Sequence, residues 1–245
     1  MENPNGWAEE SRYSRIIAIG DLHGYCDPLT RLLEIIAPGK DDLLIFIGDY
    51  VDRGPYSREV VQALIDFGSS FENAVFLKGN HEDMMLGSLG NPACVNDLST
   101  WLYNGGGLTL KSYGMGPDDF NRLTGILRNK EIEKTLLDYI PDDHLDFISG
   151  LPLYFETERF FYCHAGVAPQ SSIELGKQNP FDLLWMRDHI YAEERRWAKT
   201  VVCGHTPLSD VLFRDKLICV DTGLFCYGKL SAVDAISGEV YTVRR

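Results

Sequence analysis

The sequence lacks any apolar run long enough to cross a membrane. Its first ten residues are polar and acidic, and they contain no apolar core of the kind that a secretory signal requires. No linker rich in Pro, Gly or Ser divides the 245 residues, a length that suits one large α/β domain with a full core. We therefore expect a single domain over residues 1–245 in a cytoplasmic protein without membrane attachment.

Basic residues are scarce relative to acidic ones. The 23 Lys and Arg residues stand against 36 Asp and Glu residues, which gives a formal net charge of −13. Such a surface repels polyanions unless a local basic or metal-bearing cleft outweighs the overall negative charge. We therefore expect no extended nucleic-acid binding, and we expect the partner to be bound at a defined site.

Cysteine and glycine motifs of common binding sites are missing too. The six cysteines show no paired zinc-binding spacing, and three lie in apolar, strand-like runs, so buried free thiols are expected and disulfides are a lesser alternative. The three glycines at 105–107 lack the Lys-Ser/Thr ending of a phosphate-binding P-loop. We interpret them as a flexible break.

Five short polar segments carry the residue types of a metal site. Each follows a run rich in aliphatic or aromatic residues, which places the segments at the carboxyl ends of buried strands. Their carboxylate, imidazole and amide groups suffice to bind two metal ions. In chain order the segments are Asp21–Gly24, Gly48–Gly54, Gly79–Glu82, His164–Gly166 and Gly204–Thr206.

The first eighty residues alternate strand and helix patterns, which predicts parallel βαβαβ pairing. Asp27 is expected to cap a helix that has Pro28 at its first position. Strands are expected at 16–19, 43–47, 74–77, 153–156, 159–163, 200–203, 217–220, 230–234 and 240–243. Further helices are expected at 57–67, 99–103, 131–139 and 142–148. The last three indicate a helical insertion over about residues 91–150.

Several of these residues also have ordinary structural interpretations. An aspartate after a strand often serves as a turn or capping residue, but the accompanying histidines and Asn80 argue against this for the matched segments. Asp221 fits a turn residue and a residue that orients a histidine ligand equally well. We expect His144 and His189 on solvated faces because their neighbours are charged. The aromatic residues of the insertion are expected in its core and not in a substrate groove: Trp101, Tyr103, Tyr113 and Phe120.

With its five segments in this order, the chain resembles the calcineurin-like metallophosphoesterases over residues 16–233. Within them it is most similar to the phosphoprotein phosphatase family, in particular to its bacterial and phage serine/threonine phosphatase members. The resemblance implies an α/β fold with four layers, in which two mixed β-sheets pack face to face between helices. The helical insertion would be an addition to this sandwich.

The resemblance also implies two divalent metal ions. Asp21 and His23 would bind the first, the second would be bound by Asn80, His164 and His205, and Asp49 would bridge both. A ligand set without thiolate suits manganese, our first choice, with iron or zinc as alternatives. Such a pair shares a hydroxide that attacks phosphorus directly, so no side-chain nucleophile or phosphoenzyme is expected.

Further roles follow from the same resemblance. Arg53 would bind the phosphoryl oxygens with paired donors, and Arg187 would be the second such arginine, although Arg195 and Arg196 lie nearby. His81, held by Asp52, would protonate the leaving oxygen. Asn80 and Tyr227 are expected to contact the substrate as well.

The expected function is hydrolysis of phosphoserine and phosphothreonine in proteins or peptides. Asp52 favours this choice, because symmetrical diadenosine-tetraphosphate hydrolases share the scaffold but usually lack that aspartate. Such a hydrolase, acting on a small nucleotide, remains the alternative. A nuclease is disfavoured by the acidic surface, and a non-catalytic metal-binding scaffold is disfavoured because no expected ligand or catalytic residue is missing.

Overall fold

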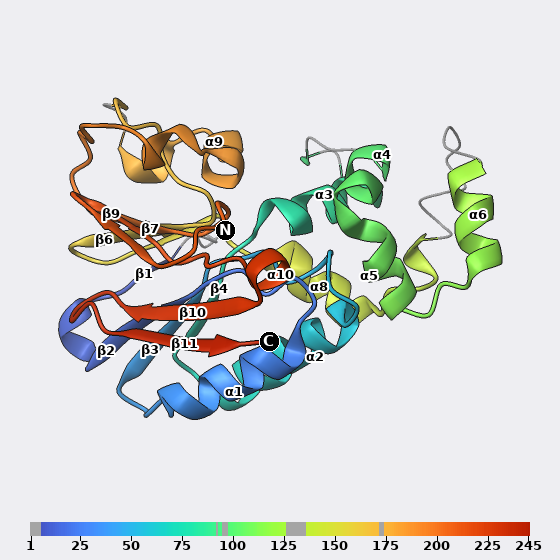
Figure 1. Ribbon diagram of the computed structural model, residues 1–245, viewed down its shortest axis with the longest axis horizontal. Helices are drawn as coiled ribbons and strands as arrows, with labels where there is room; N and C mark the ends of the chain where they lie inside the picture. Colours follow the sequence, from blue (N-terminus) through green and yellow to red (C-terminus); the bar gives the residue numbers. More distant parts are fainter. Residues whose placement is uncertain (1–5, 92, 95–97, 126–135, 172–173) are drawn as a thin grey trace.

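Two β-sheets lie face to face at the centre of the molecule (Figure 1). The computed structural model describes residues 6–91, 93–94, 98–125, 136–171 and 174–245. One sheet has the strand order β1-β5-β6-β7-β9-β8 and the other has the order β11-β10-β2-β3-β4. The first consists of β1 (Gly6–Trp7), β5 (Tyr154–Glu156), β6 (Phe160–Cys163), β7 (Thr200–Cys203), β9 (Leu217–Cys219) and β8 (Leu212–Arg214). The second consists of β11 (Val240–Arg244), β10 (Lys229–Asp234), β2 (Arg15–Ile19), β3 (Asp42–Phe46) and β4 (Ala74–Phe76).

Both sheets are mixed. Strands β2, β3 and β4 pair in parallel, as the alternating strand and helix patterns predicted, and β10 joins β2 in antiparallel register. In the other sheet β6, β7 and β9 are parallel, β5 is antiparallel to β6 but parallel to β1, and β8 is antiparallel to β9. The parallel strands of each sheet therefore end at a common edge, and the loops that follow them can meet there.

Strand β2 illustrates why the sheets are buried on both faces. Successive side chains of a strand point to opposite faces. Ile16 and Ala18 enter the core between the sheets, whereas Ile17 and Ile19 pack under the helices on the outer face. After Arg15, the strand is consequently apolar at every position from Ile16 to Ile19 and not alternating, as expected for a strand covered on both sides.

Helices cover the outer faces and complete four layers (Figure 1). Helices α1 (Cys26–Ile36) and α2 (Ser57–Ser70) cover the β2-containing sheet, and a segment with α9 (Pro180–Trp185) covers the other. The two-sheet sandwich expected from the sequence is confirmed. Outside the helical segment described below, the other helices of the described ranges are the 3₁₀ turns Glu10–Arg12, Leu175–Lys177 and Asp188–Ile190, together with α3 (Asn80–Ser88) and α10 (Leu224–Tyr227).

The start of α1 differs from the prediction. The helix begins at Cys26 after Tyr25, and no side chain caps it. Asp27 lies inside the first turn, where its carboxylate forms an ion pair with Arg31 at 3.0 Å instead of capping the helix. A carboxylate there is still favourable, because the first turn carries the positive end of the helix dipole.

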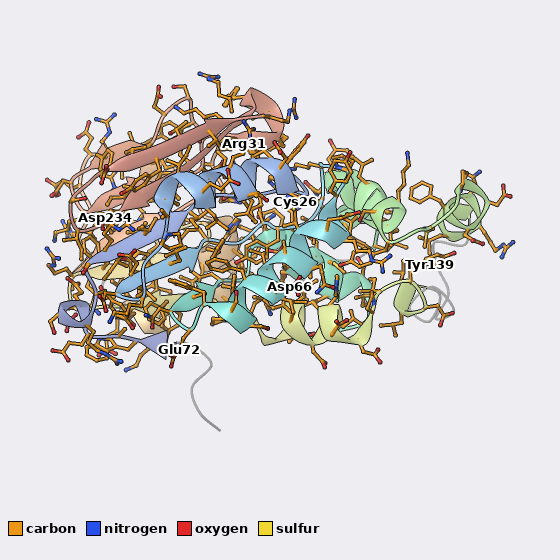
Figure 2. All side chains as sticks on the ribbon, turned by 90° about the horizontal axis from the view of Figure 1, so that it is seen from below. Cys26, Arg31, Asp66, Glu72, Tyr139 and Asp234 are labelled. Atoms are coloured by element: carbon orange, nitrogen blue, oxygen red, sulfur yellow. The ribbon has the colours of Figure 1, made fainter. Side chains whose placement is uncertain are left out.

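A helical segment extends to one side of the sandwich, so that its Tyr139 lies at the opposite end of the molecule from Asp234 of β10 (Figure 2). It packs around its own apolar core with α3. The helix expected at 131–139 lies outside the described residues except for its last four positions. The segment contains α4 (Leu98–Trp101), a π-helical turn (Leu102–Gly106), α5 (Gly107–Ser112), α6 (Pro117–Gly125) and α8 (Asp142–Gly150).

The glycines at 105–107 break the helix as expected, but the break is tightly packed. Gly105 has φ 113°, and a Cβ added to it would lie 2.9 Å from the backbone nitrogen of Arg53. A Cβ on Gly106 would lie 2.6 Å from the Trp101 ring. These close approaches, and not flexibility, explain why glycine occupies both positions.

Strand β1 was not predicted because it has only two residues, and β8 was missed because none of its three residues is buried. All six cysteines are free thiols, and Cys163, Cys203 and Cys219 are buried in adjacent strands, as expected. None of the helices in the described ranges combines the length and the apolar character that a membrane crossing needs.

Candidate metal centre

Loops from both sheets meet at the edge where their parallel strands end. All predicted metal ligands are at most 5% exposed. Asp21 and His23 follow β2, and Asp49 follows β3. Asn80 and His81 begin α3 after β4. His164 follows β6 and His205 follows β7.

The side chains form two groups of candidate ligand atoms that share Asp49. His23, Asp49 and His81 make the first group, and Asp49, His164 and His205 make the second. One Asp49 oxygen, Oδ2, lies 3.5 Å from His23 Nε2, while the other, Oδ1, lies 3.3 Å from His164 Nε2. Asp49 thus faces both groups with separate oxygens, which is the geometry of a bridging carboxylate.

Backbone carbonyls orient two of these histidines. His23 Nδ1 lies 3.0 Å from the carbonyl oxygen of Val51, and His164 Nδ1 lies 2.9 Å from that of Ile47. Each carbonyl requires an N–H at Nδ1, so in the neutral ring Nε2 carries the free lone pair. The lone pairs of both rings therefore point into the site.

Nitrogen and oxygen atoms crowd together around the second group. His164 Nε2 lies 2.9 Å from Asn80 Oδ1 and 3.2 Å from His205 Nδ1. Although burial opposes a charge, the nearby Asp49 carboxylate raises the pKa of His164. His205 Nε2 is buried and has no hydrogen-bond partner among the described residues. This donor set of imidazole, amide and carboxylate fits a divalent cation, which the lone pairs of these groups would bind.

Asp21 lies beside this cluster but in neither group. Both of its carboxylate oxygens accept from the backbone N–H of His205 at 3.2 Å, and a Cβ on Gly204 would lie 2.3 Å from Oδ1. Burial, and then the charges of Asp221 and Asp49, raise its pKa well above the usual range. Several buried carboxylates without a cation repel one another, so this part of the site also fits a metal ion.

His81 occupies the place in the first group where Asp21 was expected. Its Nδ1 donates to Asp52 Oδ2 at 2.6 Å, which leaves Nε2 facing the site at 3.9 Å from Asp49 Oδ2. Nε2 is buried and has no hydrogen-bond partner in the described part of the chain. The predicted Asp52–His81 pair is therefore in contact, with one imidazole nitrogen free to exchange a proton.

Two residues of the helical segment, Trp101 and Thr109, hold Asp52. Sequence reasoning placed Trp101 in the core of the insertion and did not mention Thr109. Trp101 Nε1 donates to both Asp52 carboxylate oxygens at 3.0 Å, and Thr109 Oγ1 donates to Oδ1 at 2.6 Å. Trp101 is buried as expected, but it packs directly beside the candidate site. Tyr113 is likewise buried, whereas Tyr103 is 92% exposed and was wrongly expected in the core.

Glu82 is a further residue that sequence reasoning did not assign. Its Oε1 accepts from the backbone N–H groups of Tyr50 and Val51 at 2.8 and 3.1 Å. Its Oε2 accepts from those of Asp49 and Gly79, both at 2.9 Å. One buried carboxylate therefore ties the loop after β3 to the start of α3. Its place in the segment Gly79–Glu82 was the signal that could have identified it.

Arg53 lies between the first group and an aromatic ring. Its Nη1 donates to His23 Nε2 at 3.3 Å, and its guanidinium carbon lies 4.2 Å from the centre of the Phe225 ring. The same ring meets His23 edge to face at 5.1 Å. Phe225, and not Tyr227, is thus the α10 residue that contacts these two side chains, while Tyr227 is 57% exposed.

Arg187 is exposed, and its charge acts on His205 of the second group. Burial and the His164 charge are the main reasons that the pKa of His205 is lowered, and the positive charge of Arg187 contributes to the same shift. The neighbouring Arg195 is buried, and it donates to the backbone carbonyls of His189 and Ile190. Arg195 is therefore committed to holding its own loop.

His144 and His189 are both buried, so the prediction of solvated faces was wrong. His144 lies between Tyr113 Oη at 2.8 Å and Gln62 Oε1 at 3.1 Å. The local charges did not reveal these long-range contacts. Asp221 Oδ1 accepts from the backbone N–H of Gly223 at 2.8 Å, which supports its interpretation as a turn residue.

Five site residues have backbones in the left-handed region. Their φ angles are 46° at His23, 55° at Asp49, 71° at Asp52, 65° at Arg53 and 64° at His205. Among the described residues only two other non-glycine positions have positive φ. Such conformations cost about 1–3 kcal/mol each and persist where surrounding contacts impose them. The backbone is thus strained where the predicted site residues converge.

Comparison with known proteins agrees with this geometry. The profile of the calcineurin-like phosphoesterases matches residues 14–236, which is most of the chain. The chain belongs to this family. This metallophosphoesterase is therefore a hydrolase, and its two ligand groups, which share Asp49, are typical of a binuclear metal site.

Individual relatives of the metallophosphoesterase share both length and fold. Serine/threonine-protein phosphatase 2 of Salmonella typhimurium is 29% identical over 227 residues, which cover 89% of this chain and 92% of that protein. The crystal structure of a candidate diadenosine tetraphosphatase has a TM-score of 0.65 at 21% identity and covers 98% of this chain and 96% of its own. A protein serine/threonine phosphatase from Saccharomyces cerevisiae has a TM-score of 0.61 at 17% identity, covering 100% and 84%. These two structures show the shared fold alone.

Proposed function

We propose that this metallophosphoesterase is a serine/threonine protein phosphatase. The observation that carries the proposal is the contact between His81 Nδ1 and Asp52 Oδ2 at 2.6 Å. A serine or threonine alkoxide is a very poor leaving group, so its departure needs a well-held proton donor. The similarity to the Salmonella phosphatase over most of both chains supports the same substrate class.

We assign two divalent ions to this site, one beside each ligand group, with Asp21 added to the first and His81 kept as the proton donor. Asp21 and His23 would hold one ion, the second would be held by Asn80, His164 and His205, and Asp49 would serve both. Manganese is the first choice, with iron or zinc as alternatives, because imidazole and carboxylate donors suit these metals. When bound, such a pair neutralises phosphoryl charge and makes a nearby water acidic enough to act as the nucleophile.

The remaining roles fall to the chain's own side chains. Arg53 and Arg187 would bind the phosphoryl oxygens through their planar, charged donors. His81 would donate the proton on Nε2 to the leaving oxygen as the phosphorus–oxygen bond breaks, while Asp52 holds Nδ1. No Ser, Cys or His is assigned as a nucleophile, so we expect no phosphoenzyme. Tyr227 remains a proposed substrate contact because it is exposed beside Phe225.

Symmetrical hydrolysis of diadenosine tetraphosphate is the second candidate. The likeness to the diadenosine tetraphosphatase structure over nearly the full length of both chains favours it. That likeness concerns the fold, which protein phosphatases share. Cleaving this dinucleotide releases a nucleoside diphosphate, a much better leaving group than an alkoxide, and it therefore depends less on His81.

A parallel turnover experiment tests the proposal. The protein with Mn²⁺ is given phosphoserine and phosphothreonine peptides, a phosphotyrosine peptide and diadenosine tetraphosphate. We expect the first two to be preferred, and we expect Asp52→Asn to slow them by about 10²–10⁴-fold, the usual scale for a positioned acid. The dinucleotide rate should fall much less, with metal content unchanged. A strong preference for the dinucleotide, or equal losses on all substrates, would contradict the proposal.

A further inference from the structure

The helical segment contacts the Asp52–His81 pair from outside the predicted ligand loops. Trp101 ends α4 and Thr109 lies in α5. Both side chains are completely buried, as is Asp52. Trp101 and Thr109 are 49 and 57 residues away from Asp52 in sequence, so the fold alone brings them together.

The contacts assign a separate partner to each Asp52 oxygen. Thr109 Oγ1 donates to Oδ1 at 2.6 Å, while Oδ2 accepts from His81 Nδ1 at 2.6 Å. The Trp101 indole N–H lies 3.0 Å from both oxygens and so spans the carboxylate. A carboxylate held this way cannot rotate about its bond to Cβ without losing several charge-assisted hydrogen bonds.

Thr109 also contacts the backbone of Asp52. Its Oγ1 lies 2.9 Å from the backbone nitrogen of Asp52 and 2.9 Å from Ser57 Oγ. Between the two residues, Gly105 packs so closely that a Cβ would meet the Arg53 nitrogen at 2.9 Å. The segment from Trp101 to Thr109 therefore fixes the side chain and the left-handed backbone of Asp52 together.

We propose that Trp101 and Thr109 are positioning residues for proton donation, which keep Asp52 oriented so that His81 Nε2 stays directed at the leaving oxygen. This inference rests on the acid role of His81 in the proposed function. A misplacement of about 1 Å can reduce a rate by about 10²-fold, so orientation matters as much as presence. The helical segment therefore helps to position the proton donor, and it also borders the site.

Two conservative variants test the inference in the full chain with Mn²⁺. Trp101→Phe keeps an aromatic ring but removes the indole N–H, and Thr109→Val keeps the shape but removes the hydroxyl. Each has a matched control away from the site. Trp197→Phe removes a buried indole donor to the Ala168 carbonyl at 2.9 Å, and Thr157→Val removes a buried hydroxyl donor to Glu10 at 2.8 Å.

The readout is the dependence of kcat on the leaving group, measured with aryl phosphates from p-nitrophenyl to phenyl phosphate. Each test variant should lower kcat for phenyl phosphate about 10-fold, since one hydrogen bond to a charged group is lost, and for p-nitrophenyl phosphate less than about 2-fold. KM and metal content should be unchanged. Thr109→Ser, which restores the hydroxyl, should restore the rate, and both controls should behave as the native protein.

Other results would overturn the inference. Equal losses on good and poor leaving groups, raised KM or reduced metal content would mean that the two residues only stabilise the fold. The same dependence on the leaving group in the two control variants would also mean that Trp101 and Thr109 only stabilise the fold. If Trp101→Phe does not fold, the comparison of Thr109→Val with Thr109→Ser decides. Failure of the native protein on phosphopeptides would refute the proposed substrate class, whereas the aryl phosphate series would still report on positioning.

Discussion

Replacing Glu82 by Gln should weaken the fold and the metal site together. The carboxylate accepts four backbone N–H groups, two on each oxygen. The Gln amide keeps one oxygen, while its NH₂ group would face the other pair of N–H donors. Two buried N–H groups then lose their acceptor at about 1–3 kcal/mol each, so we expect the free energy of unfolding to fall by about 4 kcal/mol.

The measurement should be made where Glu82 is ionised. Burial first, and the Asp49 charge second, raise its pKa to about 7, so urea unfolding with a chelator at pH 8 compares Gln with the carboxylate. In a second assay, calorimetric titration with Mn²⁺ at the same pH should show affinity lowered by about 10–100-fold, the usual effect of losing a group that orients a ligand. The weaker binding follows because the Asp49 backbone is no longer fixed.

Asp234→Asn is the matched control. Asp234 is also a buried carboxylate that accepts backbone N–H groups, those of Ile16 and Ile236 at 3.1 Å and that of Ser237 at 3.3 Å. It lies at the end of β10, far from the helical segment (Figure 2). This variant should lose stability but bind Mn²⁺ normally. Glu82→Gln protein with native Mn²⁺ affinity, or with a stability loss below about 1 kcal/mol, would refute the reasoning.

Three further outcomes are expected. Asp49→Asn should abolish turnover and reduce metal content, and full occupancy with normal turnover would contradict a shared ligand. Phe225→Leu removes the ring beside Arg53, so KM should rise about 3–10-fold while kcat changes less. An unchanged KM would show that this contact does not contribute to substrate binding. Burial, with a smaller contribution from the Arg195 charge, lowers the pKa of His189 to about 4, below about 6.5 in the unfolded chain. Protons therefore bind the unfolded state preferentially, and stability should fall by about 3 kcal/mol as the pH drops from 6.5 to 4. In urea unfolding, His189→Gln should flatten this dependence, and an unchanged slope would exclude His189 as its source.

The residues that sequence reasoning placed correctly follow strands. Parallel strands of one sheet end at one edge, so Asp21 could be expected near Asp49, and His164 near His205, once the strands were recognised. Apolar runs also indicated which cysteines are buried. These inferences needed only local patterns and one rule of sheet geometry.

The residues that were missed make contacts that no local pattern encodes. Trp101 and Thr109 reach Asp52 across about fifty residues of chain, and Phe225 reaches Arg53 across still more. The sequence around Trp101 and Thr109 carries no sign of a site, and near Phe225 it was Tyr227 that was expected to contact the substrate. His144 was misjudged for the opposite reason, because charged neighbours suggested solvent while the fold buried it between Tyr113 and Gln62.

The left-handed backbones at the site have a consequence for selection in the laboratory. At about 1 kcal/mol each, the five strained positions together approach the whole stability of a small domain. Glycine would relieve that strain, although the unfolded chain would also gain freedom, and at Asp49 it would in addition remove a buried charge. A screen that rewards only yield or heat resistance would therefore drift toward better-folded proteins without catalysis. Any laboratory selection for higher stability of this protein therefore has to measure turnover in every round.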